Sequence, residues 1–202
     1  MKQEKDRVYI SPIDKASFNL KVEGETPLLM HKFSDVSKQG LLDKQAGKSV
    51  ERHKRTKEEI AKEVEACIHR MPDGKVGFPA SGFKKAMVEA ATGKLLQGMN
   101  GKLAKGSFFI IGNLVPIKYK RQTVNEAIGR IGRNIPMVVF RPEFDGWSTE
   151  LLVRYNRSQI TVQQIVALAN LAGFHIGVGD WRPQCNGTYG MFKVLPSGSG
   201  KK

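Results

Sequence analysis

The sequence contains few of the residues from which metal sites and disulfide frameworks are built. It has two cysteines and four histidines among 202 residues. Cys67 and Cys185 lie far apart, and the histidines follow no spacing typical of zinc ligands, so we expect no metal and no other cofactor. Both cysteines are interpreted as reduced thiols, which are typical of a cytoplasmic protein.

Long apolar runs are also lacking. No stretch approaches the roughly 18 apolar residues that a membrane-spanning helix requires. Residues 1–7 lack the apolar core of a signal peptide. The sequence therefore predicts a cytoplasmic protein with no membrane partner.

Acidic residues are scarce relative to basic ones. Nineteen Asp and Glu stand against 33 Lys and Arg, which gives a net charge of +14 and a pI near 9.9. Apolar residues make up 40% of the chain and charged residues 26%, as in globular domains. Such an excess of positive charge indicates a polyanionic partner, and nucleic acid is the candidate that remains.

Motifs for nucleotide chemistry are incomplete. Gly47-Lys48-Ser49 ends like a phosphate-binding loop, but Leu42 occupies the position where that motif needs a glycine. Gly177-x-Gly179 follows a predicted helix rather than a strand, unlike a dinucleotide fingerprint. No histidine can be paired with a nucleophile, so we expect a protein that is not an enzyme.

Periodicity of apolar residues indicates a mixed α+β chain. Strands are predicted at 17–22, 108–111, 114–120, 135–140, 150–155 and 189–194, and helices at 58–70, from about 80, and at 162–172. The order predicts a single domain over 1–202 with a ferredoxin-like (RRM-like) βαββαβ core, whose sheet face often binds RNA. Three segments fall outside this core: a basic insertion at 32–57, a glycine-punctuated basic excursion at 118–137 and a flexible tail at 197–202.

The last helix has the clearest boundaries. Thr161 and Gln164 form a capping box, while Ile160 and Ile165 form a hydrophobic staple around it. Gly173 is predicted to end the helix.

The insertion at 32–57 is strongly basic. It holds eight lysines and arginines but three acids, and we expect it to be mobile. His31 lies where the first strand enters this segment, which makes it a candidate binding residue.

The glycine-rich segment 177–190 carries the most specific signal. Closely spaced glycines allow a backbone to approach another chain or a phosphate. Trp181, Arg182 and Tyr189 lie among these glycines, and flat side chains beside a cation suit base stacking with a phosphate contact. The alternative is that Trp181 packs beneath the sheet and the glycines only form turns.

Two motifs resemble those of a known family. Pro79-Ala-Ser81-Gly-Phe-Lys84 matches the entry into the first helix of RAMP-superfamily backbone subunits of CRISPR effector complexes. The segment 177–190 resembles their glycine-rich loop, and the similarity spans about 18–194. The run from Arg141 to Pro183 also resembles small phage and prophage proteins of the same architecture.

This resemblance implies a ferredoxin-like palm with finger and thumb insertions, in subunits that stack along a single strand. It implies a non-enzymatic, sequence-tolerant protein that binds single-stranded RNA, as a homo-oligomer or filament and with other effector subunits as possible partners. The predicted nucleic-acid-binding residues are His31, Lys32, Lys54, Arg55, Lys84, Lys85, Lys118, Lys120, Arg121, Arg130, Arg133, Trp181, Arg182 and Tyr189.

The chain departs from the family in two respects, and other functions stay open. It is shorter than most such subunits, and the region of Asp35 does not match the motif of members that cleave RNA. The alternatives are a phage single-stranded DNA-binding or annealing protein, an RNA-cleaving enzyme that uses Asp35 or His31, and an assembly protein that binds acidic proteins.

Overall fold

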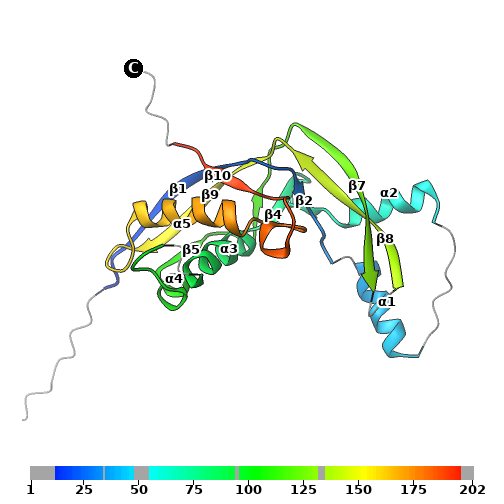
Figure 1. The fold of residues 1–202 in the computed structure, drawn as a ribbon, viewed down its shortest axis with the longest axis horizontal. Helices are drawn as coiled ribbons and strands as arrows, with labels where there is room; N and C mark the ends of the chain where they lie inside the picture. The colour runs from blue at the N-terminus through cyan, green and yellow to red at the C-terminus, as the bar shows by residue number, and fades with distance from the viewer. Residues whose placement is uncertain (1–11, 34, 48–54, 94–95, 132–134, 197–202) are drawn as a thin grey trace, which may run out of the picture.

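The computed structural model describes residues 12–33, 35–47, 55–93, 96–131 and 135–196 (Figure 1). Its strands are β1 (Lys15–Gly24), β2 (Leu28–Leu29), β3 (His69–Arg70), β4 (Val76–Pro79), β5 (Phe108–Ile110), β6 (Leu114–Pro116), β7 (Arg121–Ile131), β8 (Ile135–Asp145), β9 (Ser148–Asn156) and β10 (Phe192–Val194). Its helices are α1 (Asp35–Gln45), α2 (Lys57–Ala66), α3 (Ala80–Thr92), α4 (Gly101–Ser107) and α5 (Val162–His175), with a 3-10 turn at Pro183–Cys185. None of these helices is long and apolar enough to cross a membrane.

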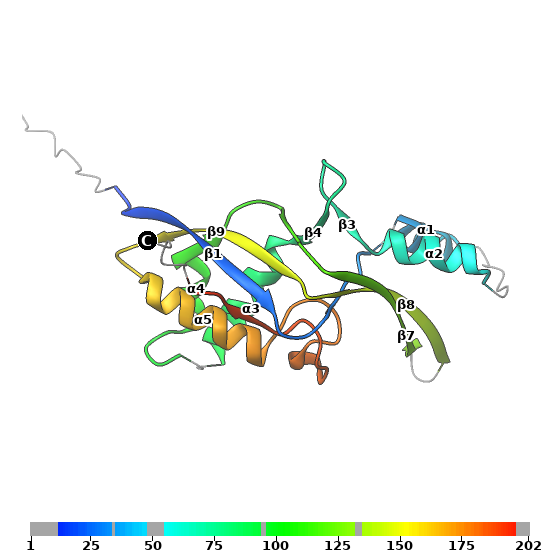
Figure 2. The same cartoon turned by 90° about the horizontal axis from the view of Figure 1, so that it is seen from above.

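A four-stranded antiparallel sheet forms the centre of the fold, in the order β10-β1-β9-β5. Its longest pairing joins β1 and β9 from Lys15 opposite Asn156 to Glu23 opposite Ser148. Helices α3 and α5 cover one face of this sheet (Figures 1 and 2). The predicted α+β class is confirmed in this form, with antiparallel sheets and helices on one face.

The core lies between this sheet and its two helices. Alternate residues of β9 point toward the helices, because successive side chains of a strand face opposite sides. The rings of Phe83, Trp147 and Phe192 pack on one another with centroids 5.6 to 6.3 Å apart. The indole of Trp147 is fully buried, and its Nε1 donates a hydrogen bond to the Thr26 carbonyl.

A long hairpin extends from this core (Figure 1). Strands β7 and β8 pair from Arg121 opposite Asp145 to Ile131 opposite Ile135, and β2 joins the base of β8. The sequence predicted a strand at 135–140 and an irregular excursion at 118–137. Polar residues on both faces of β7 hide the alternation that would have indicated this strand.

The basic insertion at 32–57 contains a helix that the sequence did not predict, α1, followed by the start of α2. Thr56 caps α2, since its hydroxyl accepts from the Glu59 amide while the Glu59 carboxylate accepts from the Thr56 amide. Strand β4 was also missed. It pairs with β6 in a small sheet separate from that of β5, so the strands predicted on either side of Gly112 do not form a hairpin.

The capping box of α5 is confirmed, but its predicted end is wrong. Thr161 and Gln164 make both reciprocal hydrogen bonds, and Ile160 and Ile165 are buried at the staple positions. The helix continues to His175. Gly173 lies within the helix and does not end it. A Cβ at this position would collide with the carbonyl of Phe192 on β10, so the glycine is needed for the helix to approach the sheet this closely.

Candidate nucleic-acid interface

The glycine-rich loop 177–190 joins α5 to β10 and is held by backbone hydrogen bonds. The Asp180 amide donates to the Leu29 carbonyl, and the Gly190 amide donates to the Pro27 carbonyl. Gly179 has a φ of 80°, and a Cβ there would collide with the backbone of Leu29. Glycine is required here for both conformation and space.

Trp181 lies in this loop with 46% of its surface exposed. Its φ of 51° is rare for a non-glycine residue. The alternative that Trp181 packs beneath the sheet is therefore wrong. Trp181 and Tyr189 line a hollow of about 250 Å³ beside β7, where the Tyr189 hydroxyl accepts a hydrogen bond from Asn125.

Asp180 links the loop to two basic side chains from other elements. Its Oδ2 lies 3.1 Å from His31 Nδ1 and 3.0 Å from Nε of Arg141 on β8. Burial raises the pKa of Asp180, but the hydrogen bond from His31 and the charges of Arg141, His31 and Arg182 outweigh burial, so the net pKa lies below its ordinary value. The carboxylate thus stays ionised and fixes the loop against β8.

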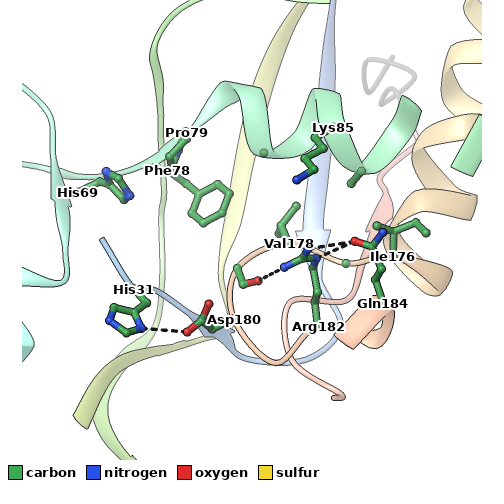
Figure 3. Close-up of a pocket in the computed structure, with 14 residues that line it drawn as sticks. His31, His69, Phe78, Pro79, Lys85, Ile176, Val178, Asp180, Arg182 and Gln184 are labelled. Atoms are coloured by element: carbon green, nitrogen blue, oxygen red, sulfur yellow. Dashed lines mark hydrogen bonds and ion pairs between the residues drawn. The ribbon is translucent and has the colours of Figure 1, made fainter. Parts of the chain in front are cut away.

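A second hollow, of about 260 Å³, opens on the other side of the loop toward the start of α3 (Figure 3). Lys85 points into it from α3, and Arg182 enters from the loop. Arg182 is held in place, because its guanidinium donates to the Gly179 carbonyl at 3.1 Å and to Gln184 Oε1 at 3.0 Å. Two histidines, His31 and His69, also line this hollow, which we call the basic hollow after Lys85 and Arg182.

The electrostatics of this hollow favour an anion. Among the residues that the structure describes, Asp180 is the one acid that lines it, and that carboxylate already faces Arg141 and His31. Burial, and then the charge of Lys32, lower the pKa of His69, so His69 is neutral at pH 7 and can donate or accept a hydrogen bond. Lys85 and Arg182 therefore supply two cations suited to one phosphate group.

Several predicted binding residues gather at this loop. His31, Lys85 and Arg182 line the basic hollow, while Trp181 and Tyr189 line the neighbouring one. Lys32 is exposed next to His31. The sequence spacing gave no direct evidence that these residues would meet, since they come from three separate segments: 31–32, the residue Lys85 on α3, and the loop 177–190.

Three predicted cations lie elsewhere, near the base of the hairpin. Lys118 is exposed where its backbone bridges to Ser148, and Arg121 forms an ion pair with Asp145 at 3.4 Å. The aliphatic part of Lys120 lies against Gly146. None of the three lines either hollow beside the loop.

Two more predicted cations have internal partners, which corrects their assignment to the binding surface. Lys84 Nζ donates to the Ala104 carbonyl at 2.7 Å and to the Phe108 carbonyl, and it lies 3.4 Å from the centroid of the Phe108 ring. Burial lowers the pKa of Lys84 to about 8. Arg55 pairs with Glu63 at 2.8 Å and stacks over the ring of Phe140 on β8.

Lys54 and Arg133 lie outside the described residues, as do the side chains of Asp35 and Arg130. Sequence reasoning overlooked Asp180, Arg141 and His69 as members of the site. Asp180 precedes Trp181 in the glycine-rich segment, so its position was the one available signal. Arg141 and His69 reach the loop through the fold alone.

Comparisons with known proteins show a similarity of fold alone. No protein-family model matches the chain, and no curated protein matches its sequence. Among solved structures, a chain from the cryo-EM structure of the type III-B Cmr-beta complex bound to cognate target RNA matches with a TM-score of 0.57 at 13% identity. The match covers 91% of this chain and 60% of that one. Cmr6 from Pyrococcus furiosus matches over 91% of this chain and all of its own length, at 7% identity and a TM-score of 0.43.

The present chain thus spans about 60% of the length of the Cmr-beta chain that it matches. At this level of identity the similarity is one of fold. It shows a fold like that of the Cmr-beta chain, in agreement with the fold that the motifs at 79–84 and 177–190 had indicated.

Proposed function

We propose that this protein binds single-stranded RNA through the surface formed by the glycine-rich loop and the basic hollow beside it. The observation that carries the proposal is the position of Trp181. Its indole is exposed on a loop with a fixed backbone, and the next residue, Arg182, turns into a hollow lined by Lys85, His31 and His69.

The chemistry follows from this arrangement. A base stacks on the Trp181 indole, and the adjoining phosphate lies between Arg182 and Lys85. Stacking on an aromatic side chain contributes about 1–3 kcal/mol per base and tolerates any sequence. Phosphate contacts release counterions, so affinity falls with salt by about 0.7 logarithmic units per contact for a single strand.

The fold supports an RNA ligand by analogy. We propose that β1, α3, β5, β9, α5 and β10 form a ferredoxin-like βαββαβ core, because they follow this order along the chain and the sheet order β10-β1-β9-β5 is that of the split βαβ pattern. The hairpin β7–β8 and helices α1–α2 are then the appendages. The Cmr-beta complex that the chain resembles is bound to target RNA. We propose the same class of ligand for the present chain. We further propose that the chain assembles along the RNA strand, alone or with other effector subunits, and that it has no catalytic activity of its own.

The test is fluorescence anisotropy with labelled single-stranded RNA, single-stranded DNA and duplex over a salt series, with gels to check that the ligand stays intact. We expect tight, salt-dependent binding of intact single-stranded RNA. Trp181→Ala and the double change Lys85→Ala/Arg182→Ala should each weaken it. Lys102→Ala, which removes an exposed cation from α4, serves as the matched control and should bind like the parent protein.

Each other outcome assigns a different function. Equal affinity for DNA would favour a single-stranded DNA-binding or annealing protein. Cleavage of the RNA that depends on His31 would favour an enzyme. Failure to bind any oligonucleotide at low salt would reject the proposal and point to an acidic protein partner.

A further inference from the structure

The central sheet has a second face, which the described helices leave open. Helices α3 and α5 lie on one side of the sheet, and Figures 1 and 2 show no helix on the other. Every second residue of its strands points to this open face, and most of these residues are exposed. The exposed ones are Lys15, Ser17, Asn19, Lys21, Phe109, Glu150, Leu152, Arg154 and Lys193.

The open face carries an aromatic side chain beside a cation. Phe109 on β5 is 53% exposed and lies directly opposite Arg154 on β9, which in turn lies opposite Ser17 on β1. Leu152 lies on the same strand, β9, two residues before Arg154 and about 7 Å from it. It is 42% exposed and lies opposite Asn19. These two apolar side chains stand among polar neighbours, and neither contributes to the buried core.

The positive charge beside Phe109 is not neutralised within the described chain. Arg154 forms no ion pair or hydrogen bond through its side chain with any described residue, whereas Lys193 pairs with Glu23 at 3.9 Å and Lys21 lies opposite Glu150. Among the described residues, Arg154 is thus the cation beside Phe109 that is left for a ligand.

We propose that this open face is a second binding surface for single-stranded nucleic acid, separate from the glycine-rich loop. One base stacks on Phe109, its phosphate contacts Arg154, and the neighbouring base packs on Leu152 within reach of Asn19. Aromatic side chains on an open four-stranded sheet bind unpaired bases in this way, and phosphate contacts complement the charge of Arg154. The proposal goes beyond the proposed function and shares with it only the class of ligand.

Two such surfaces on one chain allow it to hold two strands, or two segments of one strand. The two surfaces share no residue. The loop surface uses Lys85, Trp181 and Arg182, whereas the open face uses β5 and β9. Each can therefore be removed without touching the other.

The test combines two pairs of substitutions in the full chain: Phe109→Ala/Arg154→Ala for the open face and Trp181→Ala/Arg182→Ala for the loop. A short oligouridylate labelled with a fluorophore measures stoichiometry and affinity, and a 5-iodouridine version maps contacts by photo-crosslinking and peptide mass spectrometry. We expect two oligonucleotides per chain, with crosslinks near both Phe109 and Trp181. Each pair of substitutions should leave one oligonucleotide bound and weaken the affected surface by at least about fivefold.

The design separates this proposal from the proposed function. If the loop variant binds like the parent protein while the open-face variant loses binding, the loop proposal fails and this one stands. If the open-face variant keeps both stoichiometry and crosslinks, this proposal is overturned. A dimer that dissociates on the Phe109 and Arg154 changes would also overturn it, because the face would then bind a second copy of the chain. Lys102→Ala, an exposed cation on α4 that belongs to neither surface, is the matched control, and circular dichroism verifies that each variant is folded.

Discussion

Replacing Asp180 with asparagine should destabilise the protein, because it leaves a buried cation without its counterion. The side chain of Arg141 is 9% exposed, and its Nε and Nη1 are both buried without a hydrogen-bond partner among the described residues. The Asp180 carboxylate, 3.0 Å from Nε, is the acid that offsets this charge. His31 shares the same oxygen.

The size of the effect follows from burial. Removing one partner of a fully buried ion pair costs about 3–5 kcal/mol. Asp180 itself is 36% exposed, so solvent screens part of the interaction, and we expect a loss of about 2–3 kcal/mol. For a chain of about this length, that corresponds to a decrease in Tm of about 4–12 °C.

The assay is thermal unfolding followed by circular dichroism at pH 7 and at lower pH. Because the pKa of Asp180 lies below its ordinary value of 3.8, this pair stabilises the fold above that value and loses its contribution as the pH falls through the lower, folded-state pKa. Asp180→Asn should therefore flatten the acid side of the stability profile. Adding Arg141→Met to Asp180→Asn should recover much of the loss, since an apolar side chain needs no counterion. A single variant as stable as the parent protein, or a double variant less stable than the single one, would refute this account.

Three further changes test other parts of the structure. Thr161→Ala removes the capping box of α5 and should lower the free energy of unfolding by about 1 kcal/mol, measured by urea denaturation with Ser158→Ala as the control. Gly173→Ala should lower it by more, about 2 kcal/mol or above, because the new Cβ collides with the Phe192 carbonyl; a Tm equal to that of Gly106→Ala, where space is open, would contradict this. Lys84 has a folded-state pKa of about 8 against an ordinary 10.5, so stability should rise as the pH increases between these values, and urea denaturation of Lys84→Met should show a smaller rise.

The sequence predicted best the elements whose signals are local. The central parts of β1 and β9 depend on alternation, and the start of α5 depends on capping residues that are close in the chain. Strand β4 was missed because its buried residues, Val76–Phe78, show no alternation. The end of α5 was missed because Gly173 is needed for contact with β10, which lies far along the chain.

The residues of the candidate site were likewise predicted only where their signals are local in the sequence. Trp181, Arg182 and Tyr189 were found because glycines surround them in the sequence. The adjacent lysines Lys84 and Lys85 could not be distinguished, although one points inward to the Phe108 carbonyl and the other into the basic hollow. The direction in which each lysine side chain points depends on how α3 is rotated against the sheet, which the local sequence does not specify.

The short strand β2 has a consequence for how a ligand would be received. Leu28 and Leu29 pair with the base of β8, and the same short segment accepts hydrogen bonds from the loop, through the carbonyls of Pro27 and Leu29. The β7–β8 hairpin and the loop that carries Trp181 are therefore both hydrogen-bonded to residues 27–29. We expect a movement of the hairpin to shift the indole as well. A nucleic-acid strand that contacts both the hairpin and the loop meets two surfaces whose spacing is already fixed in the folded protein. Less conformational entropy is therefore lost on binding.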